Sequence, residues 1–473
     1  MNMESFAPLM FAGLIIIMVI GFPVAFSLAA LGLGCGIFAV TQGWFPASFM
    51  GNLPLNVFSI LSNDLLLAIP FFTLMGTILE KCGLAEDMLD SMGQLFGPVR
   101  GGLGYSVIIV GFILGAITGT VAGQVIAMAM ISLPVMMRWG YNMRYATGVL
   151  AASGTITQLV PPSLVLVVLA DQLGRPVGDM YKGAWGPSLL QIALFALYTF
   201  VLSRVRPEHV PGVPKEARTL NGWPLVLKCL RGIIPSAVLI FLVLGSMGGL
   251  PGIDTAVCTP TEAGAMGAVG AMVLAAMHKR LTWPLMKQAM TGTMRITAMV
   301  VFILIGSRVF SLVFQGVEGG KWIENMLSSL PGGQVGFLIA VNIFIFFLAF
   351  FLDFFEIAFI IIPLLAPVAA KLGIDLVWFG VLLCVNMQTS FMHPPFGFAL
   401  FYLRGIAPPE VKSSDIYWGA MPWVAMQIIL VIIVIYWPGL VTYWIDTTAV
   451  DTTNVRIDIP QIEMPPLDFG PSK

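Results

Sequence analysis

The chain has 473 residues, of which 58% are hydrophobic and only 10% are charged, and its formal net charge is -1. A soluble globular protein carries about 25% charged residues, so this composition excludes one and predicts an all-α polytopic membrane protein. The near-neutral charge also excludes the basic surface that nucleic-acid binding requires. The five cysteines show no CxxC spacing and indicate neither a metal site nor a disulfide framework.

The first apolar stretch, residues 6–40, is too long for one membrane span. Gly21, Phe22 and Pro23 interrupt it, which predicts two segments. It lacks the basic start of a signal peptide, so we expect it to stay in the mature protein. Residues 64–79 are apolar again, and residues 80–100 mix acidic with apolar side chains, as an interfacial amphipathic arm helix does.

Residues 101–137 contain no charge and would be about 55 Å long as one helix, against a hydrocarbon core of roughly 30 Å. Two full crossings with a turn need about 40 apolar residues or more. A re-entrant helical hairpin is the economical solution. Its tip is predicted at Thr118, Gly119 and Thr120, with Gln124 just beyond it.

The next charge-free run, residues 145–170, holds a cluster of polar and small residues followed by two prolines. The cluster consists of Ser153, Gly154, Thr155, Thr157 and Gln158, before Pro161 and Pro162. Consecutive prolines break a helix, and bare backbone at membrane depth is tolerated only inside protein or beside a polar cavity. The pattern predicts a substrate or ion site. The alternative is a kinked span whose hydroxyls only satisfy freed carbonyls.

Later elements follow the same hydropathy logic. We expect an apolar helix at 188–202, a basic linker at 204–231, an apolar run at 233–250, a span at 294–314, a short amphipathic piece at 321–330, a second hairpin at 335–370, a second broken span at 376–403, a last helix at 421–444 and an acidic tail at 446–473. The positive-inside rule places the linker in the cytoplasm and suits an external tail. Thr259 and Glu262 are interpreted as a helix cap.

An internal repeat divides the chain into halves, residues 1–203 and 232–445, joined by the linker. Sliding the sequence by 233 positions aligns Pro134 with Pro367, Pro161-Pro162 with Pro394-Pro395, and Trp185-Gly186 with Trp418-Gly419. Five crossings in the first half make the repeats inverted, which is typical of secondary transporters. Parallel repeats would need one crossing more or fewer.

The second broken span repeats the polar cluster before its prolines, with Asn386, Gln388, Thr389, Ser390 and His393 ahead of Pro394. Unwound carbonyls and helix ends there suit Na⁺, and half-helix N-termini suit an anion. His393 is either a titrating or substrate-binding group or a hydrogen-bonded structural one.

Two acidic residues, Asp353 and Glu356, lie in a phenylalanine-rich run within the second hairpin, and Asp353 aligns with Thr120. An acid at membrane depth predicts an ion ligand or a proton carrier. The alternative role is a cap at the hairpin turn.

These stretches together resemble the large membrane subunit of tripartite ATP-independent periplasmic (TRAP) transporters. The resemblance covers residues 5–445 and rests on residues 68–72 (AIPFF), 74–76 (LMG), 115–120 (GAITGT), 154–163 (GTITQLVPPS), 259–263 (TPTEA), 373–375 (GID) and 394–397 (PPFG). Thr118 and Thr120 stand where serine is commoner in that family, and Thr157 replaces a usual glycine, so the solute is not assigned.

The resemblance implies a Na⁺-coupled importer of the bacterial inner membrane that moves an organic acid by an elevator motion. It also implies two partners, a small membrane subunit and a periplasmic substrate-binding protein. The expected substrate-binding residues are Thr118, Gly119, Thr120, Gln124, Thr157, Gln158, Gln388 and His393. The expected Na⁺ ligands are Ser153, Gly154, Thr155, Pro161, Asn386, Thr389, Ser390 and Pro394.

Three other classes compete with this interpretation. A stand-alone Na⁺/anion symporter or an arsenite-permease-like protein would have a similar architecture. An intramembrane hydrolase would use Asp353, Glu356 or His393, but the sequence holds no GxGD, HExxH or GxSxG pattern. A channel would show flux that neither saturates nor depends on Na⁺.

Overall fold

The structure, a computed structural model, describes residues 3–214, 222–253, 255–328, 331–394 and 397–445. All regular structure in these ranges is helical. Within them, 8 helices are long and apolar enough to cross a membrane, or up to 9 if the bent pair Ala47–Leu61 and Asp64–Lys81 forms one span. The chain is a multi-pass α-helical membrane protein, as its composition predicts. The predicted acidic tail and linker residues 215–221 lie outside the described residues.

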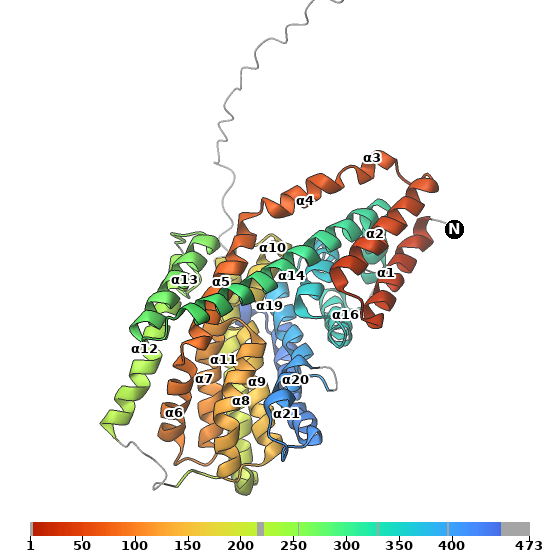
Figure 1. Ribbon diagram of the computed structural model, residues 1–473. Coiled ribbons are helices and arrows are strands. Elements are labelled where there is room, and N and C mark those ends of the chain that lie inside the picture. Colours follow the sequence, from red (N-terminus) through yellow and green to blue (C-terminus); the bar gives the residue numbers. More distant parts are fainter. Residues whose placement is uncertain (1–2, 215–221, 254, 329–330, 395–396, 446–473) are drawn as a thin grey trace, which may run out of the picture.

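The helices of the two halves are as follows (Figure 1). The first half contains α1 (Met3–Ile20), α2 (Val24–Thr41), α3 (Ala47–Met50), α4 (Leu53–Leu61), η1 (Asp64–Leu67), α5 (Ala68–Lys81), α6 (Leu84–Phe96), α7 (Gly102–Thr118), α8 (Val121–Arg138), α9 (Met143–Thr155), η2 (Ile156–Gln158), α10 (Leu164–Leu173), α11 (Val177–Val205) and η3 (Pro207–His209). The second half contains α12 (Trp223–Ser246), α13 (Pro260–Met277), α14 (Trp283–Gly316), α15 (Gly319–Ser328), α16 (Gly333–Leu348), α17 (Phe354–Glu356), the π-helical turn η5 (Ile357–Ile361), α18 (Ile362–Lys371), α19 (Leu376–Met387), η6 (Gln388–Phe391), α20 (Phe398–Ile406), α21 (Ser413–Tyr436) and α22 (Gly439–Thr442).

Two predicted helix boundaries, one at a glycine and one at a cap, are present in the structure. The first apolar stretch breaks between α1 and α2, where Gly21 has a φ of 89°. A residue with a side chain rarely adopts that conformation. Thr259 and Glu262 form a capping box at the start of α13, so their structural interpretation is confirmed.

Four helices differ from their predicted bounds. The predicted helices 188–202 and 294–314 are the C-terminal parts of α11 and α14, the predicted run 233–250 starts earlier as α12, and the predicted helix 421–444 is α21 followed by α22. These errors have one cause. A prediction from hydropathy ends a helix at a polar residue, whereas the first turn of a real helix tolerates one. Asp179 and Asp415 lie in the first turns of α11 and α21, where a negative charge interacts favourably with the helix dipole.

The predicted arm helix 80–100 is shorter in the structure. As α6, it has 13 residues and packs along α7 and α12, and Figure 1 shows it standing beside α7. The far longer α14, with 34 residues, is about 51 Å long at 1.5 Å per residue. It runs obliquely across the molecule (Figure 1), so it covers several helices of both halves.

The charge-free run 101–137 folds into two helices, α7 and α8, that pack against each other. They are joined at Gly119, which has a φ of 62°, and at Thr120, which is extended. In the second half, α16 and α18 are separated by residues 349–353, α17 and η5. There α16 packs on α19 and α21.

Helix boundaries repeat at the offset of 233 positions. The coinciding boundaries are the starts of α8 and α17 at Val121 and Phe354, the ends of α8 and α18 at Arg138 and Lys371, and the starts of α9 and α19 at Met143 and Leu376. Gly140 and Gly373 both have a φ of 72° between these helices. The two halves therefore share one local fold.

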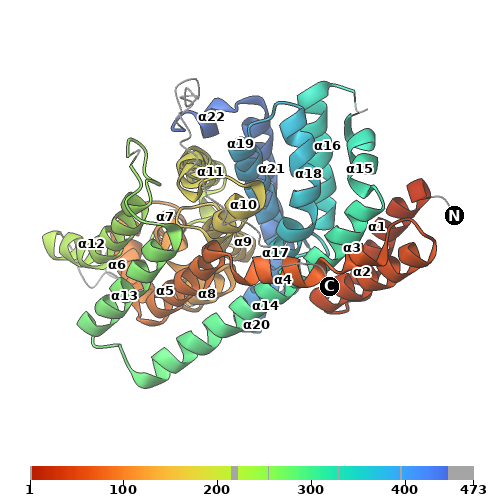
Figure 2. The ribbon, with the colours of Figure 1, turned by 90° about the horizontal axis from the view of Figure 1, so that it is seen from above.

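Contacts between the halves are reciprocal. Helix α9 packs on α21 and its counterpart α19 packs on α11; α10 packs on α19 and α20 packs on α9; α8 packs on α20 and α18 packs on α10. Figure 2 shows α7 and α8 on one side and α16 and α18 on the other side of the central α9, α10, α19 and α21. Each of these contacts therefore recurs with the halves exchanged.

Candidate functional site

Both predicted broken spans are broken in the structure. Helix α9 begins at a cap in which Asn142 Oδ1 accepts from the backbone N–H groups of Arg144 and Tyr145, and it ends at Thr155. The short turn η2 and an irregular stretch with Pro161 and Pro162 separate it from α10. In the second half, Asp375 caps α19, and η6 and an irregular stretch separate it from α20. Pro395, the second proline of that repeat, lies outside the described residues.

The polar groups of both breaks are buried inside protein. Ser153, Thr155, Gln388 and Thr389 are fully buried, and the remaining side chains of the two polar clusters are at most 5% exposed: Thr157, Gln158, Asn386, Ser390 and His393. They are therefore enclosed almost entirely by protein. This burial is what irregular backbone needs in a membrane protein.

Gln124 ties the first hairpin to the first break. Its Nε2 donates to the carbonyl oxygens of Gly111 at 2.6 Å and Ser153 at 2.9 Å, and its Oε1 accepts from the Thr157 hydroxyl. Glycine allows the close approach, since a Cβ atom on Gly111 would come within 2.7 Å of Ser153 Cβ. The structure therefore brings Gln124, Ser153 and Thr157 together.

Other groups of the first break face each other or the second half. Ser163 caps α10 by accepting from Val165 N, and its hydroxyl donates to the carbonyl of Gln158. Cys384 of α19 also lies on that carbonyl, with Sγ 3.2 Å from the oxygen. Thr155 donates to the Ala152 carbonyl and contacts the Met392 sulfur at 3.9 Å. The two breaks are thus in direct contact.

The hydroxyls of the second break donate to backbone carbonyls. Thr389 donates to Asn386 O at 2.7 Å and Ser390 to Met387 O at 2.6 Å. The Asn386 amide reaches α16, where it donates to Asn342 O at 2.8 Å. Because these hydroxyls act as donors, their lone pairs remain available to a further donor or a cation.

His393 lies between two aromatic rings, with centroid distances of 4.2 Å to Phe346 and 4.3 Å to Phe350. Neither ring nitrogen makes a hydrogen bond within the described residues, and the side chain is 2% exposed. The structural alternative predicted a hydrogen-bonded histidine, and no such bond is present in that part of the chain. Pro394 follows it directly.

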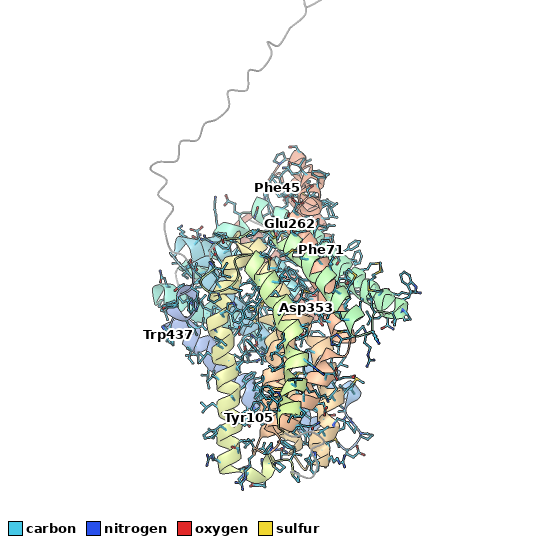
Figure 3. All side chains as sticks on the ribbon, turned by 90° about the vertical axis from the view of Figure 1, so that its left-hand side faces the viewer. Phe45, Phe71, Tyr105, Glu262, Asp353 and Trp437 are labelled. Carbon is cyan, nitrogen blue, oxygen red and sulfur yellow. The ribbon has the colours of Figure 1, made fainter. Side chains whose placement is uncertain are left out.

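The two hairpin tips differ in how their second helix starts. Thr120 makes no side-chain hydrogen bond to cap α8. The equivalent Asp353 forms a capping box with Glu356: Asp353 Oδ1 accepts from Glu356 N, and Glu356 Oε2 accepts from Asp353 N, both at 3.0 Å. Figure 3 shows Asp353 near mid-height of the molecule. Thr118 ends α7, and Gly119 supplies the left-handed turn.

A cavity of about 540 Å³ lies beside the first hairpin. Glu80 and Lys81 of α5, Gly123 and Ala127 of α8, and Gln288 of α14 are among its lining residues. A Cβ atom on Gly123 would lie 2.1 Å from Glu80 Oε2, so the Glu80 carboxylate contacts the first turn of α8.

Sequence reasoning missed three buried amide side chains near the breaks: Asn342, Gln191 and Gln427. All three lie within apolar helices, where an amide is costly unless it is hydrogen-bonded. An amide inside an otherwise apolar helix was the available signal in all three cases.

Comparison with known proteins gives one consistent family. A family model described as the tripartite ATP-independent periplasmic transporter, DctM component, matches residues 11–440. The C4-dicarboxylate TRAP transporter large permease protein DctM of Vibrio cholerae is 28% identical over 461 residues, which cover 93% of this chain and 97% of that protein. The isethionate TRAP transporter permease protein DctMQ of Oleidesulfovibrio alaskensis is 25% identical and matches 92% of this chain, which covers 65% of that protein.

Among solved structures, the YdaH transporter of Alcanivorax borkumensis superposes with a TM-score of 0.56, at 15% sequence identity, over 90% of this chain and 98% of that one. This likeness concerns the fold alone. The family match, in contrast, extends over nearly the whole sequence and includes both predicted hairpins and both broken helices. The chain therefore belongs to the DctM component of the tripartite ATP-independent periplasmic (TRAP) transporters, a family of membrane permeases.

Proposed function

We propose that this permease imports a small organic anion across the bacterial inner membrane, coupled to Na⁺. It receives the anion from a periplasmic binding protein and works with a small membrane subunit. The main support is the pair of broken helices at equivalent positions of two repeats, in contact with each other and lined by buried polar groups. Paired discontinuous helices of this kind hold substrate and ions in secondary transporters.

Na⁺ is a transported substrate here, and the break residues fit it chemically. A hard cation prefers oxygen ligands. Ser153 Oγ is buried without a hydrogen bond in the described structure, and the Thr389 and Ser390 hydroxyls have free lone pairs. Together with Gly154, Thr155, Pro161, Asn386 and Pro394, they are the proposed Na⁺ ligands.

An anion suits the first hairpin better than the second. The N-terminus of α8 carries partial positive charge and has no side-chain cap, whereas Asp353 occupies the equivalent N-terminus of α17. The substrate carboxylate or sulfonate therefore binds at Thr118, Gly119 and Thr120. Gln124, Thr157, Gln158, Gln388 and His393 contact the rest of the solute. The relatives' names, which cite C4-dicarboxylates and isethionate, support an organic anion.

The reciprocal packing supports repeats inverted in the membrane. In this proposal the hairpins and broken helices move together as an elevator against the outer helices. The longer DctMQ relative, of which this chain covers 65%, supports a small Q-type partner.

Reconstitution tests this function. The full chain and a small Q-type subunit are placed in proteoliposomes with a periplasmic binding protein of the same system, and labelled succinate and isethionate serve as probes. We expect uptake only when both Na⁺ and the binding protein are present outside. Uptake without the binding protein would instead support a stand-alone symporter. Uptake without Na⁺ would contradict Na⁺ coupling and would instead favour proton coupling, with Asp353, Glu356 or His393 as the proton carrier.

A further inference from the structure

Gln191 and Gln427 occupy equivalent places in the two repeats. Helices α11 and α21 begin 236 positions apart, at Val177 and Ser413, and each glutamine lies 14 residues after the start of its helix. Gln191 is 1% exposed and Gln427 is fully buried. Burying an amide inside an apolar helix costs free energy. Its occurrence at the same position of two helices indicates that the amides have a role.

Each glutamine hydrogen-bonds the break of the opposite repeat. Gln191 Nε2 donates to Gln388 Oε1 at 2.7 Å, and Gln427 Nε2 donates to Thr155 Oγ1 at 3.0 Å. The two acceptors, Thr155 and Gln388, are themselves equivalent, since they lie 233 positions apart. The same crossed contact therefore occurs twice, once in each direction between the two repeats.

An acceptor oxygen is left over at each contact. Oε1 of Gln191 and Oε1 of Gln427 are buried and make no hydrogen bond within the described residues. In the described orientation Gln388 Nε2 also makes no hydrogen bond among the described residues, and reversing both amides would make Gln388 Oε1, in place of Gln191 Oε1, the oxygen without a donor. For Gln427, the assigned orientation is the one that lets the Thr155 hydroxyl keep its bond to the Ala152 carbonyl.

A buried carbonyl oxygen without a donor is destabilising, and a cation satisfies it without needing a donor group. Ser153 Oγ, another buried oxygen without a hydrogen bond in this region, lies within two residues of Thr155. We propose that Gln191 and Gln427 each supply a side-chain oxygen to the cation bound at the opposite repeat's break. This inference rests on the proposed Na⁺ coupling and adds two residues to it.

The arrangement has a consequence for coupling between the two ions. Each cation would hold the broken helix of one repeat and, through the glutamine, the long helix of the other. The first bound cation therefore stabilises the arrangement of both repeats that the second cation requires. Na⁺ binding at the two sites is cooperative for this reason.

The test measures Na⁺-dependent thermal stabilisation of the purified full chain, with choline as the control cation, so it does not depend on transport. Gln191→Met and Gln427→Met remove both amide atoms at similar volume. We expect each to raise the Na⁺ concentration for half-maximal stabilisation by about tenfold, the loss of one charge-assisted contact. Gln191→Glu and Gln427→Glu keep an oxygen but lose the N–H donor, and we expect them to retain Na⁺-dependent stabilisation.

Thr199→Val is the matched control. Thr199 lies on α11 like Gln191 and is fully buried. Its hydroxyl is 2.9 Å from the Tyr145 hydroxyl of α9, and this hydrogen bond does not involve the break. It should lose stability in choline and keep the wild-type Na⁺ dependence. If wild type responds to Na⁺ and the Met variants respond equally, or if the Glu variants fail as the Met variants do, the glutamines are only structural donors and the inference is wrong. If wild type itself shows no Na⁺ response, the proposed coupling ion is overturned together with the inference.

Discussion

The packing of the two repeats depends on a glycine contact between α9 and α21 that one methyl group should disrupt. A Cβ atom added to Gly148 would lie 2.2 Å from the carbonyl oxygen of Gly419 and 2.5 Å from Trp423 Nε1. Real Cβ contacts are essentially never shorter than 3.0 Å, so the backbone of α21 would have to retreat by about 0.8 Å. Because the clash is with backbone, no side-chain rotation relieves it.

We expect Gly148→Ala to destabilise the permease by about 1–3 kcal/mol, the usual cost of overpacking a close-packed interior, despite the higher helix propensity of alanine. The measurement is the apparent unfolding temperature of the purified chain in detergent, scanned at a fixed rate.

Gly292→Ala is the control, because a Cβ atom at this position of α14 meets nothing within 4 Å. Alanine in a helix interior is favoured over glycine by roughly 0.5–1 kcal/mol, so this variant should unfold at the wild-type temperature or above it. If Gly148→Ala were as stable as Gly292→Ala, the close contact between α9 and α21 would not exist as described.

Three further predictions concern the site and the topology. Asp353→Asn keeps the cap of α17 and should cost about 1 kcal/mol or less, but we expect a severe loss of uptake or a shifted Na⁺ or pH dependence; unchanged uptake would leave Asp353 a purely structural cap. Glu80→Gln removes a negative charge beside the first turn of α8 and should lower the half-saturating concentration of an anionic solute several-fold in uptake assays; an unchanged or higher value would place the anion elsewhere. In a cysteine-free background, Glu208→Cys should react with an impermeant reagent from the cytoplasm and Gly252→Cys, beyond the other end of α12, from the periplasm; labelling of both from one side would contradict the proposed topology.

Local features of this fold were predictable because their causes are local in sequence. A few consecutive residues determine the turn at Gly119 and the proline-disrupted break after Gln158. Both features appear in the structure where the sequence predicts them. The repeat was predictable for the same reason, since prolines and glycines recur at a fixed offset.

Helix ends and contacts across the repeats were less predictable. The early start of α11 was missed because hydropathy rejects Asp179, although a helix N-terminus accepts it. The pairing of Gln191 with Gln427 was missed because α11 and α21 begin 236 positions apart, whereas the sequence alignment at 233 pairs Trp185-Gly186 with Trp418-Gly419 inside the same helices. Their crossed hydrogen bonds depend on tertiary packing, which a pattern along one chain does not contain.

The most direct test of the proposed mechanism counts ions and solute together. Radiolabelled Na⁺ and the labelled probe that supports uptake are measured in the same proteoliposomes, with the small subunit and the binding protein present. Because each of the two repeats contributes one break with buried oxygen ligands, we predict at least two Na⁺ ions entering with each solute molecule. Solute entry without accompanying Na⁺ would contradict the assignment of these breaks as coupled ion sites.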